Sequence, residues 1–119
     1  MNVNGSFAEA LERLQGEQLS SVEFVQDYVQ LRFDGPCLSA YNPHHITSSN
    51  STIAWREPGY CDALCKLIAH RVQKATVAED SIRVSFDNDA VWTMSLGDQG
   101  RTGPEAFYFV DHEGNFWVD

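Results

Sequence analysis

Two short stretches decide the fold: YVQLRFD at residues 28–34 and SIRVSFD at residues 81–87. They align without a gap at an offset of 53 residues, and in both of them apolar residues alternate with polar ones before an aspartate. Such alternation is typical of a half-buried β-strand, and aspartate is typical of the turn that follows. The same offset aligns three apolar positions of a predicted helix in each half: Phe7 with Tyr60, Leu11 with Leu64, and Leu14 with Leu67. The sequence therefore predicts an internal repeat, over residues 6–41 and 59–94.

Each predicted unit begins with a helix. In the first unit, Ser6-Phe7-Ala8-Glu9 has the spacing of a capping box. In such a box the serine oxygen accepts a hydrogen bond from the third helical N–H, and the glutamate accepts one from the serine N–H. Gly16 ends this short helix. In the second unit, apolar residues recur along one broad face over residues 60–72, after a break at Pro58-Gly59, which predicts a longer helix.

Three strands are expected after each helix. Their predicted ranges are 19–25, 28–33 and 37–41 in the first unit, and 72–77, 81–86 and 90–96 in the second. A closing hairpin is expected over residues 107–118, because two apolar stretches flank a turn that contains Gly114. Residues 42–51 are rich in serine, threonine and asparagine, so we expect a mobile loop there. The prediction is an α+β fold, in which both units form one mainly antiparallel sheet with the helices on one face.

Length and composition favour one acidic domain. The chain has 119 residues, of which 43% are hydrophobic, so a single domain over residues 1–119 is expected. Its formal charge of −9 opposes binding to nucleic acids or anionic membranes, and favours either a basic partner or simple solubility. Neither a signal peptide nor a membrane-spanning apolar stretch is recognised, and three cysteines are too few for a disulfide framework. We therefore expect a cytoplasmic protein in a reducing compartment.

Four segments carry a resemblance to known sequences: YVQLRFDGP at 28–36, GYCDALC at 59–65, GPEA at 103–106, and FWV at 116–118. With these segments, nearly the whole chain resembles a group of small uncharacterised bacterial proteins of unassigned function. The resemblance implies a bacterial origin and a single domain. It provides no catalytic or binding residue for this chain.

The common catalytic motifs are absent from the sequence. The chain contains no phosphate-binding loop that ends in Lys-Ser or Lys-Thr, no Gly-x-Ser-x-Gly, no His-Glu-x-x-His, and no dinucleotide-binding fingerprint. This absence favours a protein that is not an enzyme and needs no cofactor.

Two groups of residues have the chemistry of metal ligands. Cys61 and Cys65 lie four residues apart on the predicted helix, with His70 further along, but they share its apolar face, which favours core packing over zinc binding. His44-His45 in the polar loop and Asp111-His112-Glu113 in the closing turn could form a metal site or an acid/base pair if the fold joins them. Solvated loops are the simpler interpretation.

Two arginines could form an anion-binding pocket. Arg56 follows Trp55 just before the second helix, and Arg101 lies near Glu105 in a glycine-rich loop. A guanidinium group presents a rigid fork of donors to a carboxylate or phosphate. The simpler interpretation is that each arginine pairs with groups of its own loop.

Aromatic residues could mark a protein interface. The large rings are Trp55, Trp92, Trp117, Tyr108 and Phe116. Exposed rings on a sheet favour an interface, whereas rings at alternating strand positions favour the core, where we place Trp92.

Two functional hypotheses follow. The first is a small, acidic, non-catalytic module that binds or regulates another protein, and it depends on the charge, the missing catalytic motifs and the aromatic content. The second is a small-molecule or metal-binding protein, or an enzyme, with a cleft near Arg56, Arg101 and the histidines. The candidate ligand-binding residues are Arg56, Arg101, Glu105, His44 and His112. No catalytic residue, metal ligand or cofactor is predicted, and a homodimer is compatible with either hypothesis.

Overall fold

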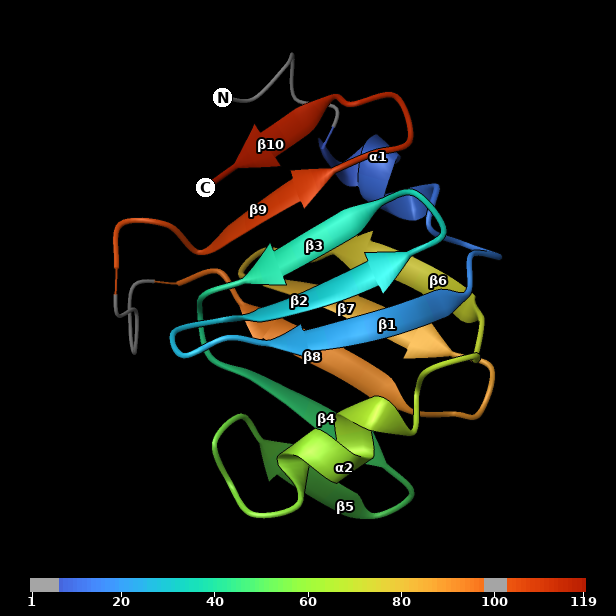
Figure 1. The fold of residues 1–119 in the computed structure, drawn as a ribbon, viewed down its shortest axis with the longest axis vertical. Helices are drawn as coiled ribbons and strands as arrows, with labels where there is room; N and C mark the ends of the chain where they lie inside the picture. Colours follow the sequence, from blue (N-terminus) through green and yellow to red (C-terminus); the bar gives the residue numbers. More distant parts are fainter. Residues whose placement is uncertain (1–6, 98–102) are drawn as a thin grey trace.

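The protein has an α+β fold with two antiparallel sheets. The computed structural model describes residues 7–97 and 103–119 (Figure 1). Sheet A has the strand order β1 (Leu19–Phe24), β2 (Val29–Phe33), β3 (Cys37–Ala40), β9 (Phe107–Val110) and β10 (Phe116–Val118). Sheet B has the order β5 (Ser51–Ala54), β4 (His44–Ser48), β8 (Val91–Ser95), β7 (Ser81–Phe86) and β6 (Val72–Val77). The prediction of one sheet was wrong, because alternation identifies strands without saying which sheet they join.

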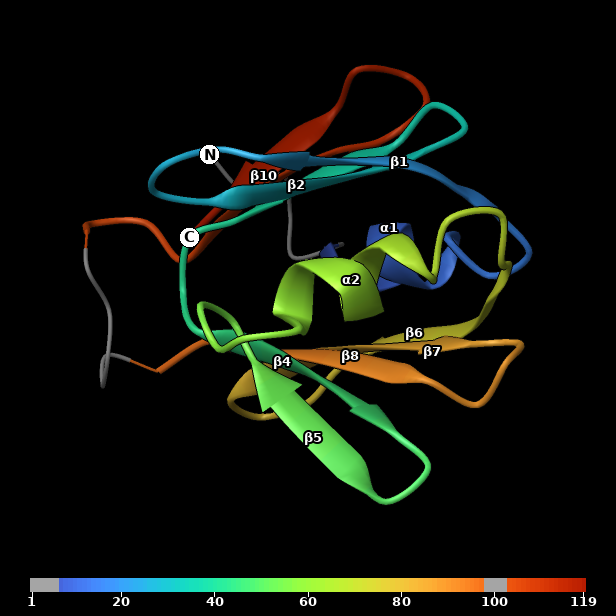
Figure 2. The same ribbon diagram turned by 60° about the horizontal axis from the view of Figure 1, so that its bottom comes forward.

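The two helices lie between the sheets. Figure 2 shows sheet A above, sheet B below, and both α1 (Phe7–Glu12) and α2 (Tyr60–Cys65) in the space that separates them. Ala10 and Leu11 of α1 are buried, as are Tyr60 and Leu64 of α2. The expectation that the helices cover one face of a single sheet was therefore wrong. Ser6, on which the predicted capping box depends, lies outside the described residues.

The chain crosses between the sheets twice. After β3 it leaves sheet A and forms the β4–β5 hairpin at the edge of sheet B, and after β8 it returns to form β9 and β10 at the edge of sheet A. The closing hairpin was predicted and is present. The mobile loop predicted over residues 42–51 was wrong, because His44 and Ile46 are buried and β4 pairs with β8.

The core is made of the residues that point inward from both sheets. Leu31 and Leu38 of sheet A are fully buried, as are Val84 and Trp92 of sheet B. Burial of one such side chain stabilises the fold by about 1.5–3 kcal/mol. The alternation of buried and exposed positions in β2 and β7 agrees with the pattern in the sequence.

Helix α2 is shorter than predicted. It ends at Cys65, whereas apolar spacing predicted a helix to residue 72. Leu64 and Leu67 are buried, but Cys61, Cys65 and Ile68 are exposed. The predicted packing of both cysteines in the core was therefore wrong, because only a narrow side of this short helix contacts the sheets. Neither described helix has the length and apolar character needed to cross a membrane.

Several features of the two halves recur 53 residues apart. The bounds of α1 and α2 differ by this offset, and so do those of β1 and β6. Both β1 and β6 have a register shift near their first residue. The N–H of Gly16 donates to the carbonyl of Val72, and the N–H of Ala69 donates to the carbonyl of Leu19, each at 2.8 Å. These contacts join the halves reciprocally, while the repeat itself stays a prediction.

Candidate functional site

Four segments of the chain enclose an open pocket, which we call the Arg56 pocket. Its volume is about 470 Å³. The lining residues are Asp27 from the β1–β2 turn, Tyr41 after β3, Arg56 between β5 and α2, and Gly103, Pro104 and Glu105 before β9. The structure thus brings together Arg56 and Glu105, which the sequence identified as candidates. Arg101, the third member of that hypothesis, lies outside the described residues.

A tight turn fixes the direction of Arg56. Its backbone has φ 79°, a left-handed conformation that is uncommon for any residue other than glycine. Glu57 closes the turn, since its N–H donates to the carbonyl of Ala54 at 3.0 Å and its Oε1 accepts from the N–H of Ala54 at 2.7 Å. The guanidinium carbon of Arg56 lies 4.2 Å from the centre of the Trp55 ring. This cation–π contact holds the side chain at the pocket wall.

The charged groups of the pocket are not paired with one another. Arg56 Nη2 donates to the carbonyl of Gln26 at 3.4 Å, but no carboxylate of a described residue lies within 4.0 Å of the Arg56 guanidinium. Within the same ranges, the side chains of Asp27 and Glu105 have no hydrogen-bond or ion-pair partner. Burial, followed by the negative charge of Glu105, raises the pKa of the Tyr41 hydroxyl, which keeps it protonated at neutral pH. The pocket therefore offers donors and acceptors of both charges.

His44 lies in the core and takes part in a buried hydrogen-bond network. Trp92 Nε1 donates to Tyr60 Oη at 3.1 Å, and Tyr60 Oη lies 2.5 Å from His44 Nδ1. Since a buried hydroxyl proton needs an acceptor, Tyr60 donates to His44 Nδ1, and the ring proton of His44 lies on Nε2. The His44 ring stacks on Trp55, with ring centres 4.6 Å apart. Trp55 thus contacts both the core histidine and Arg56.

Burial keeps His44 neutral. Desolvation, followed by the positive charges of His45 and Arg56, lowers the pKa of His44 from 6.5 to about 3. His44 Nε2 is buried and has no hydrogen-bond partner. Because its other nitrogen is bound to Tyr60, His44 has a structural role here, and it does not line the Arg56 pocket.

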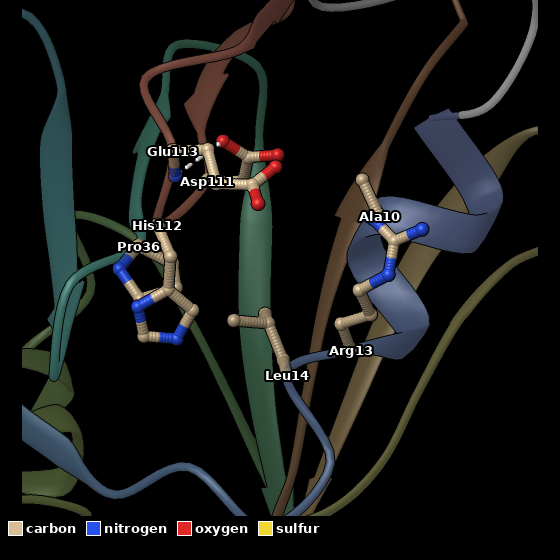
Figure 3. A pocket seen from close by; sticks show the side chains of 7 residues that line it. All are labelled: Ala10, Arg13, Leu14, Pro36, Asp111, His112 and Glu113. Carbon is tan, nitrogen blue, oxygen red and sulfur yellow. Dashed lines mark hydrogen bonds between the residues drawn. The ribbon is translucent and has the colours of Figure 1, made fainter.

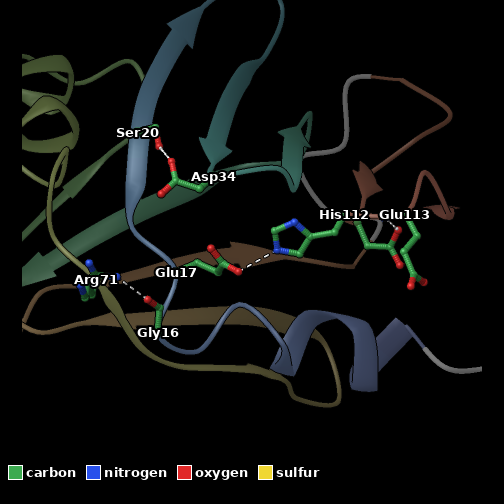
Figure 4. Close-up of polar contacts among 8 residues, drawn as sticks. Gly16, Glu17, Ser20, Asp34, Arg71, His112 and Glu113 are labelled. Carbon is green, nitrogen blue, oxygen red and sulfur yellow. Dashed lines mark hydrogen bonds and ion pairs between the residues drawn. The ribbon is translucent and has the colours of Figure 1, made fainter.

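His112 lies at a different pocket, of about 340 Å³, between α1 and the closing hairpin. Figure 3 shows Arg13 on the side opposite Asp111 and Glu113. His112 Nε2 lies 2.7 Å from Glu17 Oε2, a contact that Figure 4 marks. The structure therefore does not bring His112 together with His44, and the alternative in which these loops share a site does not form.

Hydrogen bonds within the closing turn hold Asp111. Its Oδ1 accepts from the N–H groups of Glu113 and Asn115, both at 2.9 Å. Burial raises the pKa of this carboxyl, but the hydrogen bonds from Asn115 and Glu113 outweigh burial and lower the pKa overall. Asp111 therefore stabilises the turn as a carboxylate, which leaves less of its bonding capacity for a ligand.

No metal site forms around the cysteines. His70 Nδ1 lies 2.8 Å from Asp87 Oδ1, so it is paired with the turn after β7. Across residues 7–97 and 103–119, no group of three or more histidine, cysteine, aspartate or glutamate side chains could hold a metal ion.

Aromatic side chains gather on the outer face of sheet A, where Phe116 is exposed and Tyr28, Tyr41 and Tyr108 are half-buried. Tyr28 contacts Tyr41 with ring centres 5.0 Å apart, and Tyr108 contacts Phe116 with ring centres 5.7 Å apart. Phe116 is 41% exposed, whereas Trp92 and Trp117 are buried in the core. The sequence singled out Tyr108 and Phe116, but missed Tyr28, Tyr41 and Asp27. In the sequence, polar or aromatic residues alternate with apolar ones from Tyr28 to Arg32, and this pattern could have identified Tyr28 as an outward residue.

Comparison with known proteins found no family model, curated protein or solved structure that matches the chain.

Proposed function

We propose that this protein is a non-catalytic module that binds another protein through the outer face of sheet A. The observation that carries the proposal is the pair of aromatic contacts on that face, Tyr28 with Tyr41 and Tyr108 with Phe116. Aromatic side chains that remain accessible on a flat sheet are enriched in protein interfaces, because they bury large areas on binding.

The outer face of sheet B provides the contrast. Its outward residues alternate with buried ones along β4, β7 and β8, as they do in sheet A. They are mainly polar: His45, Thr47, Arg83, Ser85, Thr93 and Ser95. On sheet A, the half-buried Val110 and Val118 extend the area around the rings. Gln30, Arg32 and Ser39 are polar at outward positions of β2 and β3, so the apolar character of sheet A is confined to the area around the rings.

Charge indicates the kind of partner. The chain carries a formal charge of −9, and Glu23, Asp27 and Glu105 are exposed on strands and turns next to the aromatic face. Arg32 Nη2 lies 3.8 Å from Glu23 Oε1, so Glu23 has an ion-pair partner. Among the described residues, the carboxylates of Asp27 and Glu105 have none. A protein with an apolar patch surrounded by lysine and arginine fits such a surface. We therefore propose a basic protein as the partner.

Paired variants of the two outer faces test this function. Tyr108→Ser with Phe116→Ser removes two rings from sheet A, and Val91→Ser with Thr47→Ser changes two outward positions of sheet B. Partners captured from native cells are identified by mass spectrometry, and the binding of the purified pair is then measured by calorimetry. We expect a basic partner whose affinity falls at least about tenfold with the sheet A variant, stays unchanged with the sheet B variant, and decreases with salt.

Two results would contradict the proposed function. One is a partner whose affinity depends on the sheet B residues and ignores the sheet A residues. The other is self-association through the aromatic face, which light scattering would detect as a dimer that the sheet A variant dissociates. A basic partner with matching face dependence supports the proposal.

A bacterial cytoplasm belongs to the same proposal. Cys37, Cys61 and Cys65 are all free thiols, and two of them are exposed. A reducing compartment maintains exposed thiols in this state.

We also infer that the two halves arose from one repeated unit. The matching bounds of α1 and α2, the matching register shifts of β1 and β6, and the reciprocal hydrogen bonds between the halves support this inference. In a crystal structure, the backbones of residues 19–41 and 72–94 are expected to superpose after an approximate twofold rotation. A different strand order in the two halves would exclude the repeat.

A further inference from the structure

We infer that the Arg56 pocket binds a small zwitterion of the free α-amino acid class, with Arg56 holding the carboxylate and Glu105 with Asp27 holding the ammonium group. This site goes beyond the protein-binding role, although Tyr41 borders both the pocket and the aromatic face. The inference starts from the unpaired charges of both signs that line one cavity.

The arrangement of charges excludes simpler ligands. A plain anion at Arg56 would lie in a pocket that also contains two carboxylates, and a plain cation would lie beside a fixed guanidinium. Both are disfavoured, because like charges in a partly desolvated pocket repel each other. A ligand with a carboxylate and an ammonium group satisfies both sides at once. It also bridges charges that are too far apart for a direct ion pair.

The structure prevents the pocket from neutralising itself. Arg56 is exposed and carries a long side chain, so in free rotation it would pair with a neighbouring carboxylate. Instead, the guanidinium lies over the Trp55 ring and donates to the carbonyl of Gln26, and these two contacts hold it in place. Trp55 is itself stacked on the buried ring of His44. The anion-binding group is therefore held in position before a ligand arrives, which lowers the entropy cost of binding.

The donors match the two ends of an amino acid. A guanidinium group presents paired N–H donors to a carboxylate, and its remaining donors here are occupied only by the 3.4 Å contact with Gln26. An ammonium group offers three donors, for which the carboxylates of Asp27 and Glu105 are acceptors. The half-buried ring of Tyr41 provides an apolar wall for the ligand's carbon atoms. Because the pocket is open, a variable side chain can extend into solvent.

Three related probes test the inference by calorimetry at millimolar concentration. L-leucine carries both charges, L-leucinamide lacks the carboxylate, and N-acetyl-L-leucine lacks the ammonium group. We expect saturable binding of L-leucine and at least about tenfold weaker binding of each derivative, since each one leaves a charged group of the pocket unpaired. Chemical shifts of the Trp55 indole in NMR spectra locate the site.

Matched variants assign the two ends of the ligand. Arg56→Gln is expected to abolish the preference for L-leucine over L-leucinamide, and Glu105→Gln the preference over N-acetyl-L-leucine. Arg83→Gln on β7 and Glu79→Gln in the β6–β7 turn make the same charge changes at exposed positions and are expected to leave the affinity unchanged. Arg56→Lys keeps the charge without the fork of donors and is expected to bind with intermediate affinity. Thermal unfolding of each variant shows that it remains folded.

Three outcomes would overturn the inference. Absence of saturable L-leucine binding removes the site. Equal binding of L-leucinamide shows a cation pocket, and equal binding of N-acetyl-L-leucine shows an anion pocket. These probes do not involve the rings of sheet A, so their results leave the role of Tyr108 and Phe116 in protein binding to its own test.

Discussion

The two helices cover aromatic clusters that differ in chemistry although they occupy corresponding places. Under α1, Phe7 stacks on Phe107 with ring centres 4.6 Å apart, and Phe109 and Trp117 lie around it. We call this the Phe7 cluster. Under α2, Tyr60 is hydrogen-bonded to His44 and Trp92, and Trp55 stacks on His44. We call this the Tyr60 cluster. Phe7 and Tyr60 each begin a helix, but Phe7 packs through rings alone, whereas Tyr60 also forms polar bonds.

Comparing the two clusters distinguishes the side chains that packing requires from those that a binding site requires. Both clusters fill the space beside a helix with large rings, which is sufficient for packing. The Tyr60 cluster adds a buried histidine that must stay neutral, and this cost brings no packing advantage over the Phe7 cluster. The Tyr60 cluster continues through Trp55 to Arg56 and the pocket, whereas the rings of the Phe7 cluster contact no arginine or lysine among residues 7–97 and 103–119. Polar burial thus accompanies the cluster that lies next to the candidate site.

The largest expected effect tests whether the two sheets have equivalent cores. Leu31 of sheet A and Val84 of sheet B are 53 residues apart, and both are fully buried. Leu31→Asp and Val84→Asp are each expected to lower the free energy of unfolding by at least about 3 kcal/mol, because each buries an unpaired carboxylate. Urea unfolding measures the loss. An unchanged midpoint in either variant would show that the sheets are not equivalent.

The next largest effect is expected at acid pH, where protonation of His44 in the Tyr60 cluster lowers the free energy of unfolding. The folded-state pKa of His44 is about 3, while the unfolded chain has the ordinary value of 6.5. Below pH 6.5 the unfolded state binds a proton that the folded state does not bind, so the free energy of unfolding falls as the pH falls. The loss amounts to about 2 kcal/mol by pH 5. Thermal and urea unfolding between pH 7 and pH 5 measure it.

A double variant provides the control for the acid effect. His44→Phe with Tyr60→Phe gives the Tyr60 cluster the chemistry of the Phe7 cluster and removes the titrating group. The free energy of unfolding of this variant is expected to stay nearly constant between pH 7 and pH 5. If its acid sensitivity equals that of the unchanged protein, His44 is not the cause.

The hairpin turns of the two sheets are expected to respond differently to small changes. Gly35 in sheet A has φ 119°, and a Cβ there would lie 2.3 Å from His112 Nδ1. Gly35→Ala is therefore expected to cost about 1–3 kcal/mol and to displace the ring of His112. Asp89 in the corresponding turn of sheet B has φ 70°, and Asp89→Gly is expected to change stability by less than about 0.5 kcal/mol. Equal losses at both positions, measured by thermal unfolding, would contradict this difference.

The thiols are expected to show the smallest effect, seen in reaction rates. Cys61 and Cys65 on α2 are exposed, while burial raises the pKa of the half-buried Cys37 on β3, even though the charge of Arg32 opposes this shift. Two thiols are therefore expected to react fast with a thiol reagent in the folded protein, and the third slowly. All three are expected to react after denaturation, and elemental analysis is expected to find no stoichiometric zinc. One zinc per chain, or a single titratable thiol, would favour a metal site or a disulfide.

Local pattern predicted individual elements better than their arrangement. The alternation in β2 and β7 predicted both strands, and the glycine turn predicted the closing hairpin. The β4 strand was missed because His44, Thr47 and Ser48 resemble a solvated loop, and burial of His44 depends on Tyr60 and Trp92 from distant segments. The division into two sheets was missed because strand pairing is a tertiary choice that a period of two does not encode.

The site was predictable only in part for a similar reason. Proline and glycine breaks drew attention to Arg56 and Glu105, and both line the same pocket. Asp27 and Tyr41 complete that pocket from the β1–β2 turn and the end of β3, which no local pattern connects with Arg56. Cys61 and Cys65 were assigned to the core because apolar spacing was counted over residues 60–72, beyond the end of α2 at Cys65.

The exchange of hairpins makes the two halves dependent on each other. Sheet A is completed by β9 and β10 from the second half, and sheet B by β4 and β5 from the first. A chain that ended before α2 would leave β3 without a neighbour on one side, and its own β4–β5 hairpin would have no sheet to join. Unpaired strand edges of this kind pair readily with a strand of another chain, and a second copy of the same half provides one. Each sheet thus depends on strands from the other part of the chain, as each subunit of a strand-swapped dimer depends on its partner.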